Sequence, residues 1–257
     1  DNVDGTVAIG GNALAALTSG AGNTAVGYQA GASITTNTNC TFIGYQAGMD
    51  ADASNTSPVS CTYIGSRSGE NIDDGVGANT AVGYLALFGA TSAGNTAANN
   101  VAVGVDSLFG ITSGGSNTAV GRTALAALTT GDNNVAIGKD AGDSIGSQSQ
   151  CVLIGVDAGQ LLSHDDANGS VAIGYLAMRY GTRGAANTAI GWKSMDLIDG
   201  IAADNNTAIG HSSMLSSGTS ANSTASNNVA VGASSLTAIT TGGSNVAIGR
   251  SAGAEIT

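Results

Sequence analysis

The chain has 257 residues, of which 40 are glycine and only one is proline, so it is neither a collagen nor a proline-rich linker. Apolar residues make up 42% but aromatic residues only 4%, which favours a thin, regular core of Ala, Val, Ile and Leu. Seven scattered basic residues in a chain of net charge −11 disfavour a nucleic-acid partner, and without an apolar run of about 18 residues we expect no membrane insertion in this segment.

One short phrase, [Thr/Val]-Ala-[Val/Ile]-Gly, recurs along the whole chain. The residue before the glycine is Val or Ile in every copy, and the residue three before it is Thr or Val in every copy. The basal spacing is that from Gly10 to Gly27, and every departure from it is an insertion. The 14 copies lie, in chain order, at 7–10, 24–27, 41–44, 62–65, 80–83, 101–104, 118–121, 135–138, 152–155, 171–174, 188–191, 207–210, 229–232 and 246–249.

Each copy of the phrase is typical of a β-strand. Its β-branched residues favour extended backbone and recur at period 2, so they share one face. The basal period, about 17 residues, accommodates two short strands and two turns. Turn sequences such as TTGDNN (129–134) lie between copies. The sequence therefore predicts an all-β fold, a parallel β-solenoid of about 14 coils in which 1–257 form a single repeat domain. At the strand spacing, 14 coils give a rod of roughly 65 Å.

The two faces of the strand carry different side chains. Four residues before the glycine, nine copies have Asn, which predicts a ladder of side-chain amides along the stack. We expect the Val/Ile face to fill the roll and the Ala/Gly face to pack against neighbouring chains. The opposite assignment, with Ala and Gly lining a narrow roll, is the alternative.

Three stretches of the chain resemble repeats of known proteins. NTAVGYQAG (23–31), NVAIGKDAG (134–142) and SVAIGYLAM (170–178) resemble the head repeats of trimeric autotransporter adhesins of the YadA type. They resemble even more the NTAVGYQA-type arrays of bacteriophage tail-fibre and related virion proteins. The adhesin heads differ from this chain in having a shorter basal period.

The resemblance implies a left-handed parallel β-roll and a homotrimer, intertwined or side by side. It implies a structural, non-enzymatic segment of a longer tail fibre, located in the virion or on a cell surface and attached to a host glycan or protein. The head of a bacterial trimeric adhesin is the alternative. A more distant one is an ice-binding solenoid, which needs two outward Thr per coil, whereas we expect the single Thr/Val position to point inward.

The residue directly after the repeat glycine is variable and collects large side chains. A column of exposed rings is suited to weak, repeated glycan binding. The alternative is that these rings only cover the corner of the strand. The candidate binding residues are Tyr28, Tyr45, Tyr84, Tyr175, Trp192 and His211.

Five insertions interrupt the regular spacing, and we expect them along one edge of the rod. They either build a binding face or are tolerated loop growth. They lie near 50–60, 89–99, 159–169, 196–204 and 216–227.

The sequence contains few residues arranged in a way that would support catalysis or metal binding. The two histidines, His164 and His211, lie in different coils without a nucleophile motif, and a depolymerase would need paired carboxylates in a groove. Acidic clusters at 49–55, 71–75 and 163–169 match no calcium-loop pattern. We therefore predict no catalytic residue, no metal site and no cofactor.

Three copies replace the Asn by cysteine and the Ala by a larger apolar residue. The pairs are Cys40 with Phe42, Cys61 with Tyr63, and Cys151 with Leu153. Because the two positions share a face, the exchange predicts an alternative, apolar layer in the core. Buried free thiols are favoured, and a disulfide between Cys40 and Cys61 in consecutive coils is the alternative.

Overall fold

The computed structural model describes residues 3–51, 60–73, 78–90, 95–162, 167–180, 184–196, 203–215 and 224–256. Within these ranges the fold is all-β, with fourteen strands of three residues each and no helix. The predicted β-solenoid of parallel strands with a repeat of about 17 residues is therefore confirmed. The chain divides into two compact units, unit 1 (Asp1–Asp132) and unit 2 (Asn133–Thr257).

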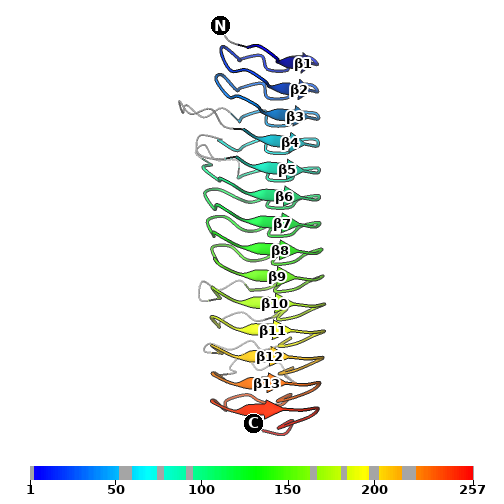
Figure 1. Ribbon diagram of the computed structural model, residues 1–257, viewed down its shortest axis with the longest axis vertical. Helices are drawn as coiled ribbons and strands as arrows, with labels where there is room; N and C mark the ends of the chain where they lie inside the picture. Colours follow the sequence, from blue (N-terminus) through cyan, green and yellow to red (C-terminus); the bar gives the residue numbers. More distant parts are fainter. Residues whose placement is uncertain are drawn as a thin grey trace. The chain divides into compact units, whose positions relative to one another are not determined.

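In unit 1 each strand pairs in parallel with the strand of the next coil (Figure 1). The register aligns equivalent positions of the repeat, so that Val7 lies opposite Thr24 and Ile9 opposite Val26. The strands are β1 (Val7–Ile9), β2 (Thr24–Val26), β3 (Thr41–Ile43), β4 (Thr62–Ile64), β5 (Thr80–Val82), β6 (Val101–Val103) and β7 (Thr118–Val120).

Unit 2 follows the same plan, with each strand parallel to the next and in the same register. Its strands are β8 (Val135–Ile137), β9 (Val152–Ile154), β10 (Val171–Ile173), β11 (Thr188–Ile190), β12 (Thr207–Ile209), β13 (Val229–Val231) and β14 (Val246–Ile248).

Each coil has one strand in the described residues, so the prediction of two strands per coil is wrong. A second strand does not form because the residues two and four after the repeat glycine have left-handed backbone. In the coil of β2 these are Gln29 and Gly31, with φ of 54° and 58°, which is left-handed and not extended backbone. The segment still bonds from coil to coil, because the Gln29 N–H donates to the Gly11 carbonyl at 2.9 Å.

The repeat glycine is required by both its torsion and its surroundings. Gly27 has a φ of 141°, and a Cβ built on it would lie 2.2 Å from the carbonyl oxygen of Gly44 in the next coil. No side chain fits that space, so any other residue would push two coils apart. The glycine turns the chain outward at the end of the strand, which positions the residue that follows it.

The interior of the roll lies on the Ala side of the strand, so the expected assignment of the two faces is wrong and its alternative is correct. The middle residue of each strand from β2 to β14 is buried, while the Thr/Val and Val/Ile residues on either side of it are partly or largely exposed. Buried Leu and Ile side chains from the rest of the coil already fill the interior. The roll therefore has no room for the Val and Ile side chains of the strand as well. The side chains that fill the interior include Ile34, Leu87, Ile111, Leu125 and Leu128.

The predicted amide ladder is confirmed. The Oδ1 atom of Asn100 accepts from the backbone N–H of Asn117 at 2.9 Å and from its Nδ2 atom at 3.1 Å. The Nδ2 atom of Asn117 also donates to the Gly131 carbonyl at 2.9 Å, so one amide links two turns of the coil. Asn206 and Asn228 repeat the arrangement in unit 2.

The three cysteines are buried free thiols, as predicted. Phe42, Tyr63 and Leu153 share the interior with them and have no exposed surface. Space for these larger residues comes from glycine four residues after the repeat glycine, where most other coils have Leu or Met. A Cβ on Gly48 would lie 2.4 Å from the ring of Phe42.

Candidate functional site

The six candidate binding residues form a column of exposed side chains in each unit, which we call the ring column. It consists of the residues that directly follow the repeat glycines. The tyrosines and the tryptophan are between 42% and 51% exposed, and the imidazole of His211 is also exposed. The glycine before each of them turns the side chain away from the core, so the column is accessible to solvent.

In unit 1 the structure brings two of the three predicted tyrosines together. Tyr28 and Tyr45 stack with ring centroids 5.7 Å apart and an interplanar angle of 15°. Tyr84 lies two coils beyond Tyr45, because the intervening coil has Ser66 at this position. The ring column of unit 1 is therefore interrupted at Ser66.

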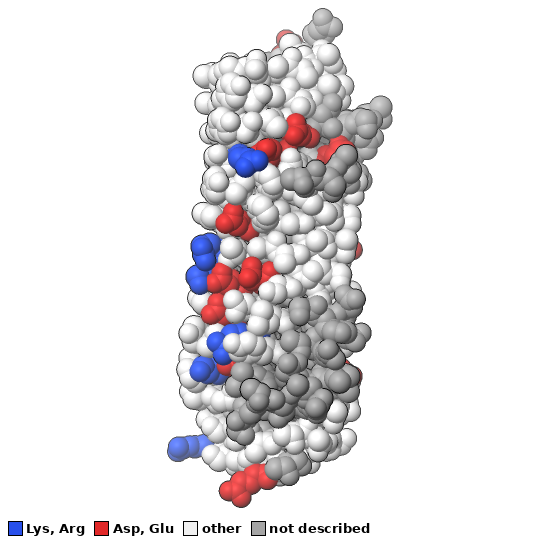
Figure 2. All heavy atoms as spheres, turned by 180° about the vertical axis from the view of Figure 1, so that it is seen from behind, with Lys and Arg blue, Asp and Glu red and all other residues white. Residues whose placement is uncertain are grey.

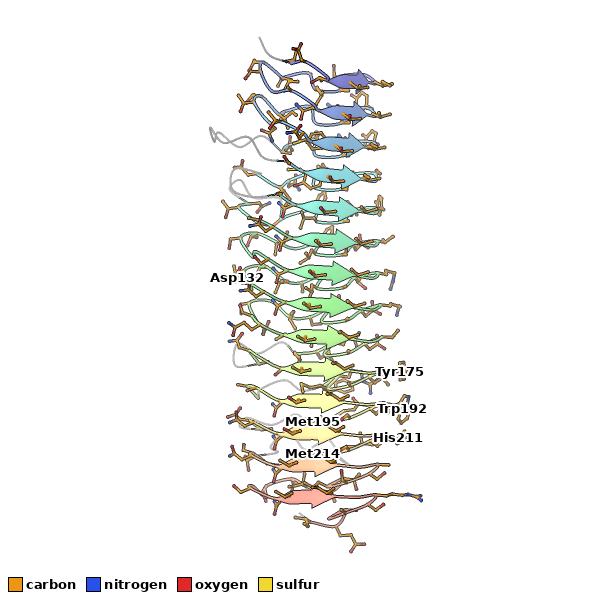
Figure 3. All side chains as sticks on the ribbon, in the orientation of Figure 1. Asp132, Tyr175, Trp192, Met195, His211 and Met214 are labelled. Carbon is orange, nitrogen blue, oxygen red and sulfur yellow. The ribbon has the colours of Figure 1, made fainter. Side chains whose placement is uncertain are left out.

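In unit 2 the predicted residues form a continuous stack. Tyr175, Trp192 and His211 lie one after another at the same corner of consecutive coils (Figure 3). The centroid distances are 6.4 Å and 4.5 Å, with interplanar angles of 23° and 15°. Both faces of the Trp192 ring are thus covered by its neighbours, and the Nζ atom of Lys193 lies 4.7 Å from its centroid. A stack of this kind presents ring edges to solvent.

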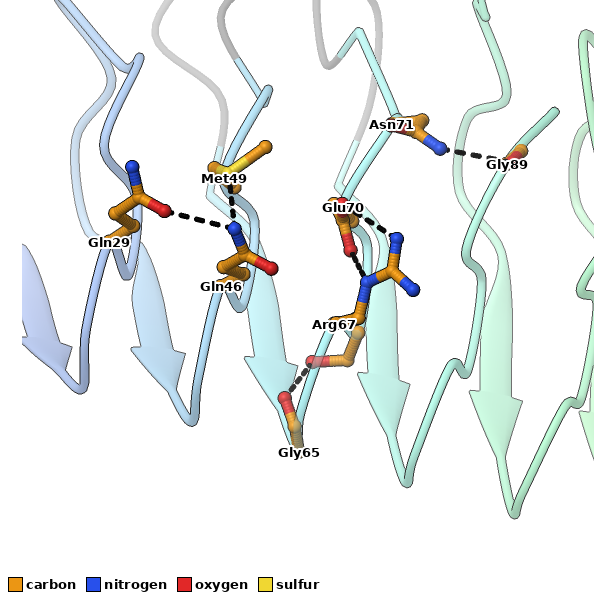
Figure 4. A network of polar contacts seen from close by, with 9 residues as sticks. Gln29, Gln46, Met49, Gly65, Arg67, Glu70, Asn71 and Gly89 are labelled. Carbon is orange, nitrogen blue, oxygen red and sulfur yellow. Dashed lines mark hydrogen bonds and ion pairs between the residues drawn. The ribbon is translucent and has the colours of Figure 1, made fainter. Parts of the chain in front are cut away.

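A second group of side chains in unit 1, which includes the partly exposed Arg67 and the buried Glu70, was missed by sequence reasoning (Figure 4). The guanidinium of Arg67 forms a bidentate ion pair with Glu70 and lies 4.8 Å from the centroid of Phe88. Phe88 in turn stacks on Phe109 at 5.1 Å. The hydrogen bond to Glu70 raises the pKa of Arg67, so this guanidinium keeps its positive charge.

The signal for this group is a common offset from the repeat glycine. Glu70, Phe88 and Phe109 each stand five residues after their glycine, and so do Arg179 and Asp196 in unit 2. Arg179 and Asp196 lie 3.3 Å apart as a partly buried ion pair. Figure 2 shows acidic and basic side chains lying side by side in small groups on the face it presents. Within the Arg67–Glu70 and Arg179–Asp196 ion pairs the charges balance one another.

The outer face of the strands is a second candidate site. It consists of the first and third residues of each strand, and we call it the strand face. All of these residues are Thr, Val or Ile, and several of the Ile side chains are about 40% exposed, such as Ile43, Ile137 and Ile209. Thr occurs in the first position but never in the third, although both have the same extended backbone. Strand propensity alone does not explain this difference.

Large parts of the predicted insertions and of the acidic clusters lie outside the described residues, and so does His164. Within the described ranges no group of three potential ligands is close enough to hold a metal ion. The same ranges contain no helix with the length and apolar character needed to cross a bilayer.

Comparison with known proteins finds no matching family, no matching curated protein and no matching solved structure. The ring column and the strand face are therefore the features of the chain that bear on its function.

Proposed function

We propose that the chain is a non-enzymatic, structural segment of a surface fibre, of the phage tail-fibre kind, that assembles as a homotrimer through its strand face. The observation that carries this proposal is the composition of the strand face. A solvated face would accept Thr, Ser or Lys at either outward position, yet the third position of each strand is Val or Ile throughout. An apolar column repeated at every strand is typical of a surface covered by another chain.

The chemistry of the strand face favours a second copy as its partner. Neither outward position of any strand carries a charge, so two such faces can meet without burying unpaired charge. The constant strand spacing lets the columns of one chain match those of another along the whole contact.

The mass in solution tests this assembly. Light scattering of the purified chain at micromolar concentration should give about three times 24.7 kDa. A monomer under these conditions would refute the trimer.

We further propose that the ring column contributes to attachment at a host surface. Its side chains are exposed at regular intervals, and a trimer would present three copies of each column, so weak contacts would add together. A glycan array probed with the assembled chain tests this role. Binding that is unchanged when Tyr28, Tyr45, Tyr84, Tyr175 and Trp192 are all replaced by serine would exclude it.

Ice binding is a second candidate, because the expectation that Thr points inward is wrong. Thr24, Thr41 and Thr62 lie on the strand face in consecutive strands. The array has at most one outward Thr per strand, and Val replaces it in half of them, which is why we place this candidate second. Inhibition of ice recrystallisation by the isolated chain would support this candidate. If the chain does not inhibit recrystallisation, contact with a partner chain is the remaining role for the strand face.

A further inference from the structure

One position in the ring column of unit 1 lacks a ring although rings lie on both sides of it. Tyr45, Ser66 and Tyr84 follow the glycines of three consecutive coils. Backbone hydrogen bonds fix their order, since the Arg67 N–H donates to the Tyr45 carbonyl at 2.8 Å and the Leu85 N–H to the Ser66 carbonyl at 3.1 Å. Ser66 therefore forms the floor of a gap between two tyrosines.

The width of this gap follows from the coil spacing. Two strand spacings separate the coil of Tyr45 from that of Tyr84, which is about 9.6 Å. A ring placed midway would lie about 4.8 Å from each tyrosine. The ring stacks already present in the column have centroid distances between 4.5 Å and 6.4 Å. The gap thus has room for one more ring.

The two tyrosines are available to a ligand. Tyr28 covers one face of Tyr45, and the other face is turned toward the coil of Ser66. Tyr45 is 51% exposed and Tyr84 50% exposed, so solvent reaches both rings. By contrast, Trp192 in unit 2 has both ring faces covered.

The polar edge of the gap is provided by Arg67. Arg67 directly follows Ser66 in the chain, and its guanidinium pairs with Glu70 and lies 4.8 Å from the centroid of Phe88. The Glu70 carboxylate balances its charge. The surroundings of the gap are therefore polar but close to neutral.

We propose that this gap is a binding slot for one neutral pyranose ring, held between Tyr45 and Tyr84 above Ser66. The C–H faces of a pyranose are apolar and stack on aromatic rings, while its hydroxyl groups remain at the edge, beside Ser66, Arg67 and water. A neutral sugar fits better than an acidic one because Glu70 already pairs with Arg67. The slot deepens the proposed attachment role and rests on it.

Saturation-transfer NMR on the assembled chain tests the slot directly. The probes are the methyl glycosides of glucose, galactose and N-acetylglucosamine, with phenol as a flat aromatic comparison. We expect at least one glycoside to bind at about millimolar Kd, as is typical of a single shallow contact. Binding of phenol without any glycoside, or no binding at all, would overturn the assignment.

A pair of substitutions at the floor of the slot provides the control. Ser66→Tyr should complete a continuous stack from Tyr28 to Tyr84 and abolish glycoside binding, whereas Ser66→Ala should keep it within about twofold. Tyr84→Ala should weaken binding at least tenfold, and Ser147→Ala, at an exposed turn in unit 2 outside the ring column, should leave it unchanged. If Ser66→Tyr binds the glycoside as well as the wild type does, the slot is wrong. A glycan-array signal retained by that variant would then show that attachment stands without the slot.

Discussion

At the scale of single residues, the fold depends on backbone torsions that most side chains avoid. Every described coil places non-glycine residues at positive φ, among them Leu14, Leu87 and Leu125 with φ between 52° and 54°. Left-handed backbone costs a non-glycine residue about 1–2 kcal/mol. Burial of the leucine side chain and coil-to-coil hydrogen bonds offset this cost. The repeat glycines have no such compensation, because their φ and the carbonyl of the next coil exclude a side chain altogether.

The first prediction concerns a repeat glycine and a matched control in unit 2. Gly174 has a φ of 131°, and a Cβ on it would lie 2.5 Å from the Gly191 carbonyl oxygen, whereas a Cβ on Gly146 meets nothing within 4 Å. We expect Gly174→Ala to lower the free energy of unfolding by about 2–4 kcal/mol and Gly146→Ala to change it by less than about 0.5 kcal/mol. Urea unfolding followed by circular dichroism measures both. Equal effects would contradict the close approach of the coils.

The second prediction concerns the thiols. Burial raises the pKa of Cys151, partly opposed by backbone hydrogen bonds from Ser170 and Gly169, so the neutral thiol is favoured in the folded state. The stabilising contribution is fully present below the unfolded thiol pKa of about 8.5 and is lost as the pH rises through the higher folded value. At pH 8 the 3 cysteines should not react with a disulfide reagent until denaturant is added. Ser147→Cys, at an exposed turn, should react at once.

At the scale of the single coil, two positions share one volume of the interior. Where the middle residue of the strand is Phe42, Tyr63 or Leu153, the residue four after the glycine is itself glycine. Where the middle residue is Ala, that position is Leu or Met in most coils. The cysteine layer thus differs from the others at three positions: Cys replaces Asn, a large apolar residue replaces Ala, and Gly stands four after the repeat glycine. The thiol still accepts a hydrogen bond from the next coil, because the backbone N–H of Cys61 donates to the Sγ atom of Cys40 at 3.5 Å.

The third prediction tests this shared volume. Phe42→Ala should cost about 3–5 kcal/mol, because it leaves a cavity between its own coil and its neighbours. Adding Gly48→Leu should recover part of that loss, since leucine already adopts the same left-handed torsion at the equivalent Leu87, with a φ of 52°. Gly48→Leu alone should destabilise, because its Cβ would lie 2.4 Å from the Phe42 ring. Additive effects in this double-mutant cycle would show that the positions do not share a volume.

At the scale of the molecule, the repeat predicted the architecture but not which face of the strand points into the interior of the roll. The constant basal period and the Asn position were enough to predict parallel coils and the amide ladder. The faces could not be assigned, because both are apolar and a strand pattern does not reveal how wide the interior is. The left-handed residues were missed for a related reason, since Leu and Met at those positions have no turn signature. Ring positions were predictable, but their stacking and the gap at Ser66 required the coil order.

The last prediction concerns assembly and separates the strand face from the rest of the surface. Ile137 and Ile209 lie on this face at 40% and 38% exposure, so neither is needed to fill the core of its own chain. The double substitution Ile137→Lys and Ile209→Lys should leave the circular dichroism spectrum unchanged. It should also convert a trimer into monomers, since each lysine would bury an unpaired charge at the contact. Ser147→Lys places the same charge at an exposed turn and should leave the mass unchanged. A trimer that survives the double substitution would show that the chains meet through a different face, while loss of the folded spectrum would show that these side chains stabilise the single chain.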